Sequence, residues 1–165
     1  MSTTLFFRGD HTESVQIDYD PKVTSYDKLL KLFWNNHDST ACHTRQYMSA
    51  IFYHNEEQKE AAEKSKEVHQ KKKMRPVVTK ILKAETFYDA ENYHQKYLLR
   101  NKRALLNSLG LNDKQVITSH VACRLNGYVG GYGSEDQFDE DLPKLGLSKE
   151  QEEFVRNCID QAYPA

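Results

Sequence analysis

The sequence has few of the features that mark a membrane protein or a nucleic-acid-binding protein. No apolar run approaches the ~20 residues that a membrane-spanning helix needs, and the Leu-Phe-Phe near the start lacks the longer hydrophobic region of a secretory signal. Lys and Arg number 23 against 24 Asp and Glu, so the net charge of -1 creates no overall field that favours polyanions. We therefore expect neither a nucleic acid nor a membrane as partner.

Cysteine is also scarce. The three cysteines form an odd set without metal-ligand spacing: Cys42, Cys123 and Cys158. Such a set is typical of reduced thiols in an intracellular protein, and we expect a cytoplasmic one. The seven histidines show no ligand spacing either, so the sequence predicts no metal site and no cofactor.

The hydrophobic pattern predicts an α+β fold. Polar and apolar residues alternate over 14–20, and apolar residues gather at 48–53 and 77–82, as in strands. Between them, Thr24 or Ser25 can cap a helix with an apolar stripe from Tyr26 to Trp34, and Asn55 with Gln58 can start another that runs toward Lys73. This order of elements indicates two layers within a single domain, 1–165, with its core at about 10–110.

A C-terminal extension of about 111–165 follows. Residues 98–109, together with the segment before them, suggest two short helices that end at Gly110. Four glycines within 126–133 predict a flexible loop. Ser148 and Gln151 form a capping box, which predicts a last helix through Cys158.

Residues 87–98, FYDAENYHQKYL, are dense in aromatic, acidic and imidazole groups. Tyr93 and Tyr97 would lie one helical turn apart, a spacing that is more often found in a core than in a site. Three other blocks of sequence accompany this segment, however, and the four blocks in their order along the chain resemble the A-type peptide methionine sulfoxide reductases. The other blocks are DHTE at 10–13, LKLFWNNHD at 30–38 and QYMSAIFYHNEEQ at 46–58. The resemblance implies a mixed sheet flanked by helices in a ferredoxin-like arrangement.

The resemblance also assigns roles to two residues. Glu13 matches the acid that protonates the leaving oxygen, and Tyr47 matches a tyrosine that donates a hydrogen bond to the sulfoxide oxygen. From the residues alone, a solvated Glu13 at the start of a strand and a Tyr47 that only packs across strands remain open.

The sequence departs from the family pattern at the nucleophile. It contains no Gly-Cys-Phe-Trp-Gly motif and no carboxylate at 41–45, where the family has an Asp before the tyrosine. We therefore expect an N-terminally incomplete domain with little or no turnover of its own. Cys42, beside His43, is a substitute nucleophile to consider, although a single loop cysteine usually has no such role. Cys123 and Cys158 flank the glycine-rich segment where the family often has resolving cysteines, but Cys158 lies in a predicted helix and is more often structural there.

The function that the resemblance implies is protein repair: thiol-dependent reduction of the S-epimer of methionine sulfoxide, in proteins or free, with thioredoxin as reductant. Two alternatives stay open. One is a non-catalytic relative that acts by binding, and the other is a truncated form.

Overall fold

The computed structural model describes residues 2–4 and 12–162, and it places the chain in two compact units. The α/β unit is Leu5–Tyr88, and the helical unit is Asp89–Ala165 together with Met1–Thr4. The division of the sequence into a core of about 10–110 and an extension of about 111–165 stays a prediction. The single-domain organisation stays a prediction, and Asp10 and His11 of the first family block lie outside the described residues.

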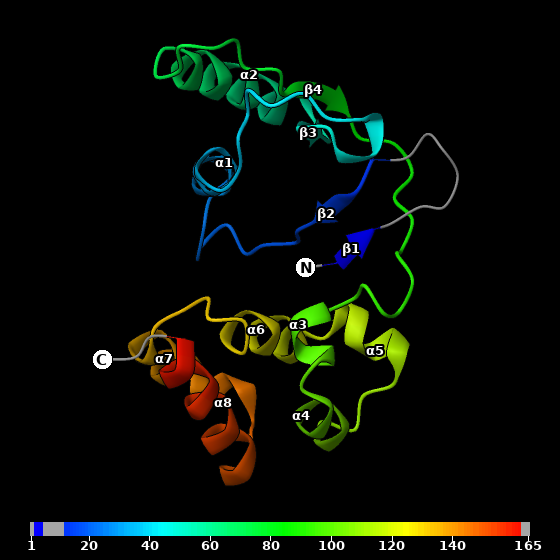
Figure 1. Ribbon diagram of the computed structural model, residues 1–165, viewed down its shortest axis with the longest axis vertical. Coiled ribbons are helices and arrows are strands. Elements are labelled where there is room, and N and C mark those ends of the chain that lie inside the picture. Colours follow the sequence, from blue (N-terminus) through cyan, green and yellow to red (C-terminus); the bar gives the residue numbers. More distant parts are fainter. Residues whose placement is uncertain (1, 5–11, 163–165) are drawn as a thin grey trace. The chain divides into compact units, whose positions relative to one another are not determined.

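The α/β unit contains a β-α-β element built on a parallel pair of strands (Figure 1). Its elements are β2 (Ser14–Gln16), α1 (Tyr26–Asn35), a 3₁₀ helix η1 (Arg45–Tyr47), β3 (Ala50–Tyr53), α2 (Glu56–Gln70) and β4 (Lys80–Lys83). β3 pairs with β4 in parallel, with Ala50 opposite Lys80 and Tyr53 opposite Lys83. The mixed α/β character expected from the sequence is confirmed, and the ferredoxin-like arrangement stays a prediction.

Both predicted helix starts in this unit are confirmed by their caps. Ser25 Oγ accepts a hydrogen bond from Lys28 N at 3.3 Å, and Asn55 Oδ1 accepts one from Gln58 N at 2.8 Å. Gln58 Oε1 in turn accepts from His54 N at 2.8 Å, so the first turn of α2 is closed from both sides. The helix ends at Gln70, three residues before the expected 73.

The strands are shorter than predicted. β2 covers 14–16 rather than 14–20, and β3 begins at Ala50 because 45–47 forms η1. β4 begins at Lys80 rather than at 77. The backbone N–H groups of Val77 and Val78 donate instead to Gln70 Oε1 at 2.7 Å and to Ser39 O at 2.9 Å. Non-local partners therefore take the hydrogen bonds that a longer strand would use.

The core of the α/β unit forms around the predicted stripe of α1. Leu30 and Trp34 are buried there with Ile51, Ala62 and Val77. The indole Nε1 of Trp34 donates to Ser65 Oγ at 3.0 Å, which satisfies the one polar atom of this large side chain.

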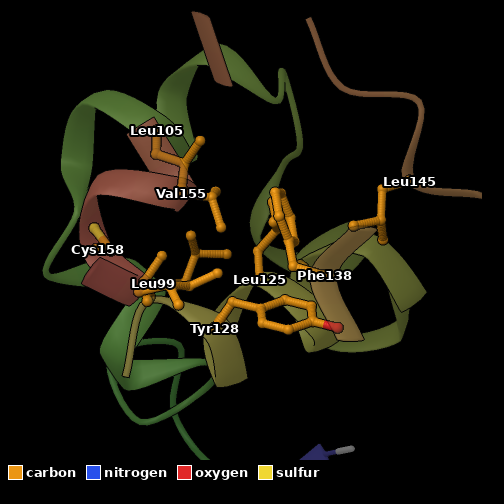
Figure 2. Close-up of a cluster of buried hydrophobic side chains, with 11 residues drawn as sticks. Leu99, Leu105, Leu125, Tyr128, Phe138, Leu145, Val155 and Cys158 are labelled. Atoms are coloured by element: carbon orange, nitrogen blue, oxygen red, sulfur yellow. The ribbon is translucent and has the colours of Figure 1, made fainter. Parts of the chain in front are cut away.

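The helical unit is an assembly of short helices around one apolar cluster. In addition to β1 (Ser2–Thr4), it contains α3 (Tyr97–Arg100), α4 (Arg103–Ser108), α5 (Asp113–Thr118), α6 (His120–Tyr128), α7 (Glu135–Leu145) and α8 (Lys149–Ala162). Figure 2 shows side chains of α3, α4, α6, α7 and α8 in this cluster, including Leu99, Leu125, Phe138 and Val155, all of them fully buried. The sequence did not predict α5, α6 or α7.

Two other expectations for this unit are wrong in part. The 87–98 segment is not helical before Tyr97. It turns through bonds from His94 N to Glu91 O and from Gln95 N to Asn92 O, and Lys96 then adopts a left-handed φ of 52°. The glycine-rich loop is also shorter than expected, because 126–128 belong to α6.

The last helix and its capping box are confirmed. Ser148 N donates to Gln151 Oε1 at 2.9 Å, and Gln151 N donates to Ser148 Oγ at 3.2 Å. Gly110 has a φ of +63° at the predicted helix end. Among the described residues, no helix is both long and apolar enough to cross a membrane.

Candidate functional site

Glu13 and the segment that carries Tyr47 lie side by side in the α/β unit, although 33 residues separate Glu13 from Gln46. Glu13 N donates to Gln46 O at 2.8 Å, and Thr12 Oγ1 donates to Arg45 O at 3.1 Å. The side chains meet as well, because Gln46 Nε2 donates to Glu13 Oε1 at 3.1 Å. The structure therefore joins the first and third sequence blocks, and each contributes one predicted site residue.

Tyr47 is presented to solvent by η1. The residue is 57% exposed and lies outside the strands, and its role at the site stays a prediction. Tyr47 N donates to Thr44 O at 3.1 Å, which closes the single 3₁₀ turn. Glu13 is exposed too, and Gln46 between them is half-buried. The acid and the phenol therefore both face solvent on segments that are hydrogen-bonded to each other.

A series of polar contacts holds the segment that follows Tyr47. His37 Nδ1 lies 2.7 Å from Phe33 O, and its Nε2 lies 2.7 Å from Ser49 Oγ. Because a carbonyl can only accept, Nδ1 carries a proton and donates to Phe33 O. Ser49 Oγ continues to Thr79 Oγ1 at 2.7 Å, which ties α1 to the residue just before β4. Sequence reasoning missed this series of contacts, since nothing in the spacing links these residues.

The loop before η1 contains the candidate thiol. Cys42 and His43 are both exposed there. The loop begins at Asp38, whose Oδ1 accepts from Thr40 Oγ1 at 2.7 Å and whose Oδ2 accepts from Arg75 at 3.0 Å. The hydrogen bond from Thr40 and the charge of Arg75 lower the pKa of Asp38. Asp38 is thus the carboxylate of this loop, and it is held at the loop's start.

The other two cysteines belong to the helical unit. Cys158 is buried in the apolar cluster, as expected for a structural residue in a helix, and Cys123 is half-buried in α6. Among the described residues, none of the three cysteines forms a disulfide. Within the described part of the chain, no three His, Cys, Asp or Glu side chains gather in a way that would hold a metal ion.

Comparisons with known proteins agree with this arrangement of blocks. The family described as peptide methionine sulfoxide reductase matches residues 5–124, and the helical domain described as that of selenoprotein methionine sulfoxide reductase A matches residues 110–160. Both parts of the chain thus have counterparts among methionine sulfoxide reductases, and the chain belongs to the peptide methionine sulfoxide reductase family.

Three relatives show how much of the chain is shared. A peptide methionine sulfoxide reductase of Drosophila melanogaster is 45% identical over 156 residues, which are 93% of this chain and 63% of the relative. A Methanococcus maripaludis reductase is 49% identical over 106 residues, or 61% of this chain and 68% of the relative. One from Lactuca sativa is 47% identical over 100 residues, or 57% and 39%. The chain therefore spans about two-fifths to two-thirds of the length of these relatives.

Proposed function

We propose that the α/β unit binds the methionine S-sulfoxide group, in proteins or as the free amino acid, and supports its reduction by a thiol. The observation that carries this proposal is the pairing of Glu13 with the segment of Tyr47 across 33 residues of sequence. Family membership supports the substrate class, and a relative that matches 93% of the chain is named as a peptide methionine sulfoxide reductase.

In the proposed reaction, Tyr47 donates a hydrogen bond to the sulfoxide oxygen and Glu13 supplies a proton to it. A thiolate attacks the sulfur, the S–O bond breaks, and the oxygen passes to the thiol as a sulfenic acid. The sulfoxide gains two electrons and becomes the thioether, and the thiol loses them. A dithiol such as that of thioredoxin then reduces the sulfenic acid, and the products are a disulfide and one water. We place this chemistry in the cytoplasm, where thiols stay reduced.

Cys42 is the thiol within the α/β unit that can be tested as nucleophile, because the sequence of this unit contains no other cysteine. It is exposed in the loop that leads into η1. A second candidate function, binding without turnover, follows from the same observation: if Cys42 does not attack, this unit has no thiol of its own for the reaction. The turnover that we expect is low.

The experiment has two readouts. Binding of an N-acetyl-methionine S-sulfoxide amide is followed by NMR shifts, and its dithiothreitol-dependent reduction is followed by chromatography. We expect binding that weakens about tenfold in Tyr47→Phe, because the phenol is lost and the ring stays. Turnover that disappears in Cys42→Ser would identify the nucleophile, and binding without any turnover would establish the second candidate. A folded chain that does not bind the probe contradicts the proposal.

A further inference from the structure

The carboxylate of Glu13 is held at two points by one residue, Gln46. The backbone bond from Glu13 N to Gln46 O, at 2.8 Å, fixes the register of the two segments. The bond from Gln46 Nε2 to Glu13 Oε1, at 3.1 Å, then fixes the side chain. Gln46 is half-buried and Glu13 is exposed, so the donor is the less solvated partner. A backbone already in register lowers the entropy cost of the side-chain bond.

The chemistry of the donor decides where a proton can lie on Glu13. The NH₂ group of a carboxamide only donates hydrogen bonds, and an ionised carboxylate oxygen accepts them more strongly than a neutral oxygen does. When Glu13 takes up a proton, Oε1 remains the better acceptor as the carbonyl oxygen of the acid, and the proton lies on Oε2. We propose that Gln46 is a positioning residue that assigns the transferable proton of Glu13 to Oε2 and holds this oxygen ready for the sulfoxide.

This inference rests on the proposed function and deepens it. Gln46 directly precedes Tyr47 in η1, so one short element presents the phenol and orients the acid. The two donors to the sulfoxide oxygen would then move together with η1. A flexible acid would instead sample both of its oxygens and several directions.

The contact itself is tested without substrate. The side-chain amide resonances of Gln46 are followed by ¹⁵N NMR while the full chain is titrated from pH 7 to pH 3. We expect them to shift as Glu13 takes up its proton and to stay constant in Glu13→Gln. The control variant is Thr44→Ala, because Thr44 is exposed beside η1 and its side chain makes no capping bond. A resonance that does not respond, or that still responds in Glu13→Gln, overturns the contact.

The consequence for the site is tested by binding of the N-acetyl-methionine S-sulfoxide amide. Gln46→Met keeps the length of the side chain but removes the donor, and we expect about tenfold weaker binding. Gln46→Glu should bind weakly at neutral pH, where two carboxylates repel each other. It should recover as the pH falls, because a protonated Glu can donate to Glu13.

Each result of the binding test decides one question. Thr44→Ala is expected to bind as the unmodified chain does. Gln46→Met that also binds like the unmodified chain at every pH overturns the positioning role. An unmodified chain that does not bind the probe overturns the proposed function, and the amide titration then separates that failure from a failure of the contact.

Discussion

The imidazole of His69 is stacked on the indole of Trp34, with ring centroids 4.6 Å apart and an interplanar angle of 22°. Its Nε2 lies 3.0 Å from the hydroxyl of Ser39, a residue with no solvent exposure. A second imidazole, that of His37, lies 6.4 Å from the same indole at 23°. The core of the α/β unit therefore joins α1 to α2 through rings that can take up protons.

This arrangement predicts that the α/β unit loses stability in mild acid. Burial lowers the pKa of His69, and the charges of Lys73, His37 and Lys72 lower it further. The folded state thus prefers the neutral ring. The stability that the neutral His69 ring contributes is complete at pH values above the pKa of about 6.5 that histidine has in the unfolded chain. It is lost as the pH falls toward the lower pKa that His69 has in the folded state.

The free energy of unfolding, measured in urea between pH 8 and pH 5, checks this prediction. We expect a decline below pH 6.5 that is smaller in His69→Gln, whose amide keeps a polar group near Ser39 but does not titrate in this range. The difference between the two curves is the relevant quantity, because it isolates the contribution of His69. Parallel curves would contradict the prediction.

Local signals in the sequence predicted the helix starts of the α/β unit. Ser25 and Asn55 are followed three residues later by the N–H groups that they cap, and this relationship is complete within one turn. Strand limits depend on distant partners. Val77 and Val78 have the composition of a strand, but their N–H groups bond to Gln70 and Ser39. A pattern of side chains cannot show where a backbone donor finds its acceptor.

The residues of the candidate site could be predicted from the sequence, whereas the contact that holds Glu13 could not. Glu13 and Tyr47 were predicted through their resemblance to family blocks, and composition alone favoured neither. The contact between Glu13 and Gln46 spans 33 positions of the sequence, and no local pattern of residues predicts it. In the helical unit, the six-residue α5 lacks a full amphipathic repeat, so periodicity detects it poorly.

Removal of Phe138 should destabilise the helical unit strongly. This side chain has no solvent exposure and packs edge-on against Tyr128, with centroids 5.0 Å apart. Phe138→Ala would leave a large cavity, and we expect a loss of about 3–5 kcal/mol in the free energy of unfolding. Tyr132→Ala is the matched control, since Tyr132 is 72% exposed and its loss should cost less than about 1 kcal/mol. Equal effects in chemical denaturation would contradict this account of the core.

The hydroxyl of Tyr128 should make the helical unit sensitive to alkali. It donates to Asp141 Oδ2 at 2.8 Å and lies 3.0 Å from Gln137 O. Burial, and then the bond to Asp141, raise the pKa of Tyr128 to about 12. The folded state prefers the neutral phenol, so this contribution is constant below the unfolded pKa of about 10 and is lost as the pH rises toward 12.

Tyr128→Phe separates two effects of this hydroxyl, its contribution to stability at neutral pH and the loss of stability in alkali. At pH 7 the variant should be less stable by about 1–2 kcal/mol, because Asp141 loses one donor and keeps the guanidinium of Arg124 at 3.1 Å. Between pH 10 and pH 12 its stability should fall less steeply than that of the unmodified protein. Both quantities come from urea denaturation followed by circular dichroism. A variant that is equally stable at pH 7 would show that the buried bond contributes nothing.

Gly133 and Gly110 provide a matched pair for testing how closely the loop before α7 is packed. Both have a positive φ, +124° and +63°, which an L residue rarely adopts. A Cβ at Gly133 would lie 2.7 Å from Cε1 of the Tyr128 ring, whereas a Cβ at Gly110 would meet nothing within 4 Å.

Gly110→Ala should therefore lower the free energy of unfolding only by the cost of a positive φ for Ala, about 1 kcal/mol. Gly133→Ala should cost more, about 2–4 kcal/mol in total, because Ala adopts a φ of +124° less readily than one of +63° and because a buried ring is displaced. The tyrosine fluorescence and near-ultraviolet circular dichroism of the folded variants should change for Gly133→Ala only, because the clash falls on Tyr128. If both variants lose the same stability, the ring has room to move, and the close packing of this loop against α6 does not constrain the helical unit.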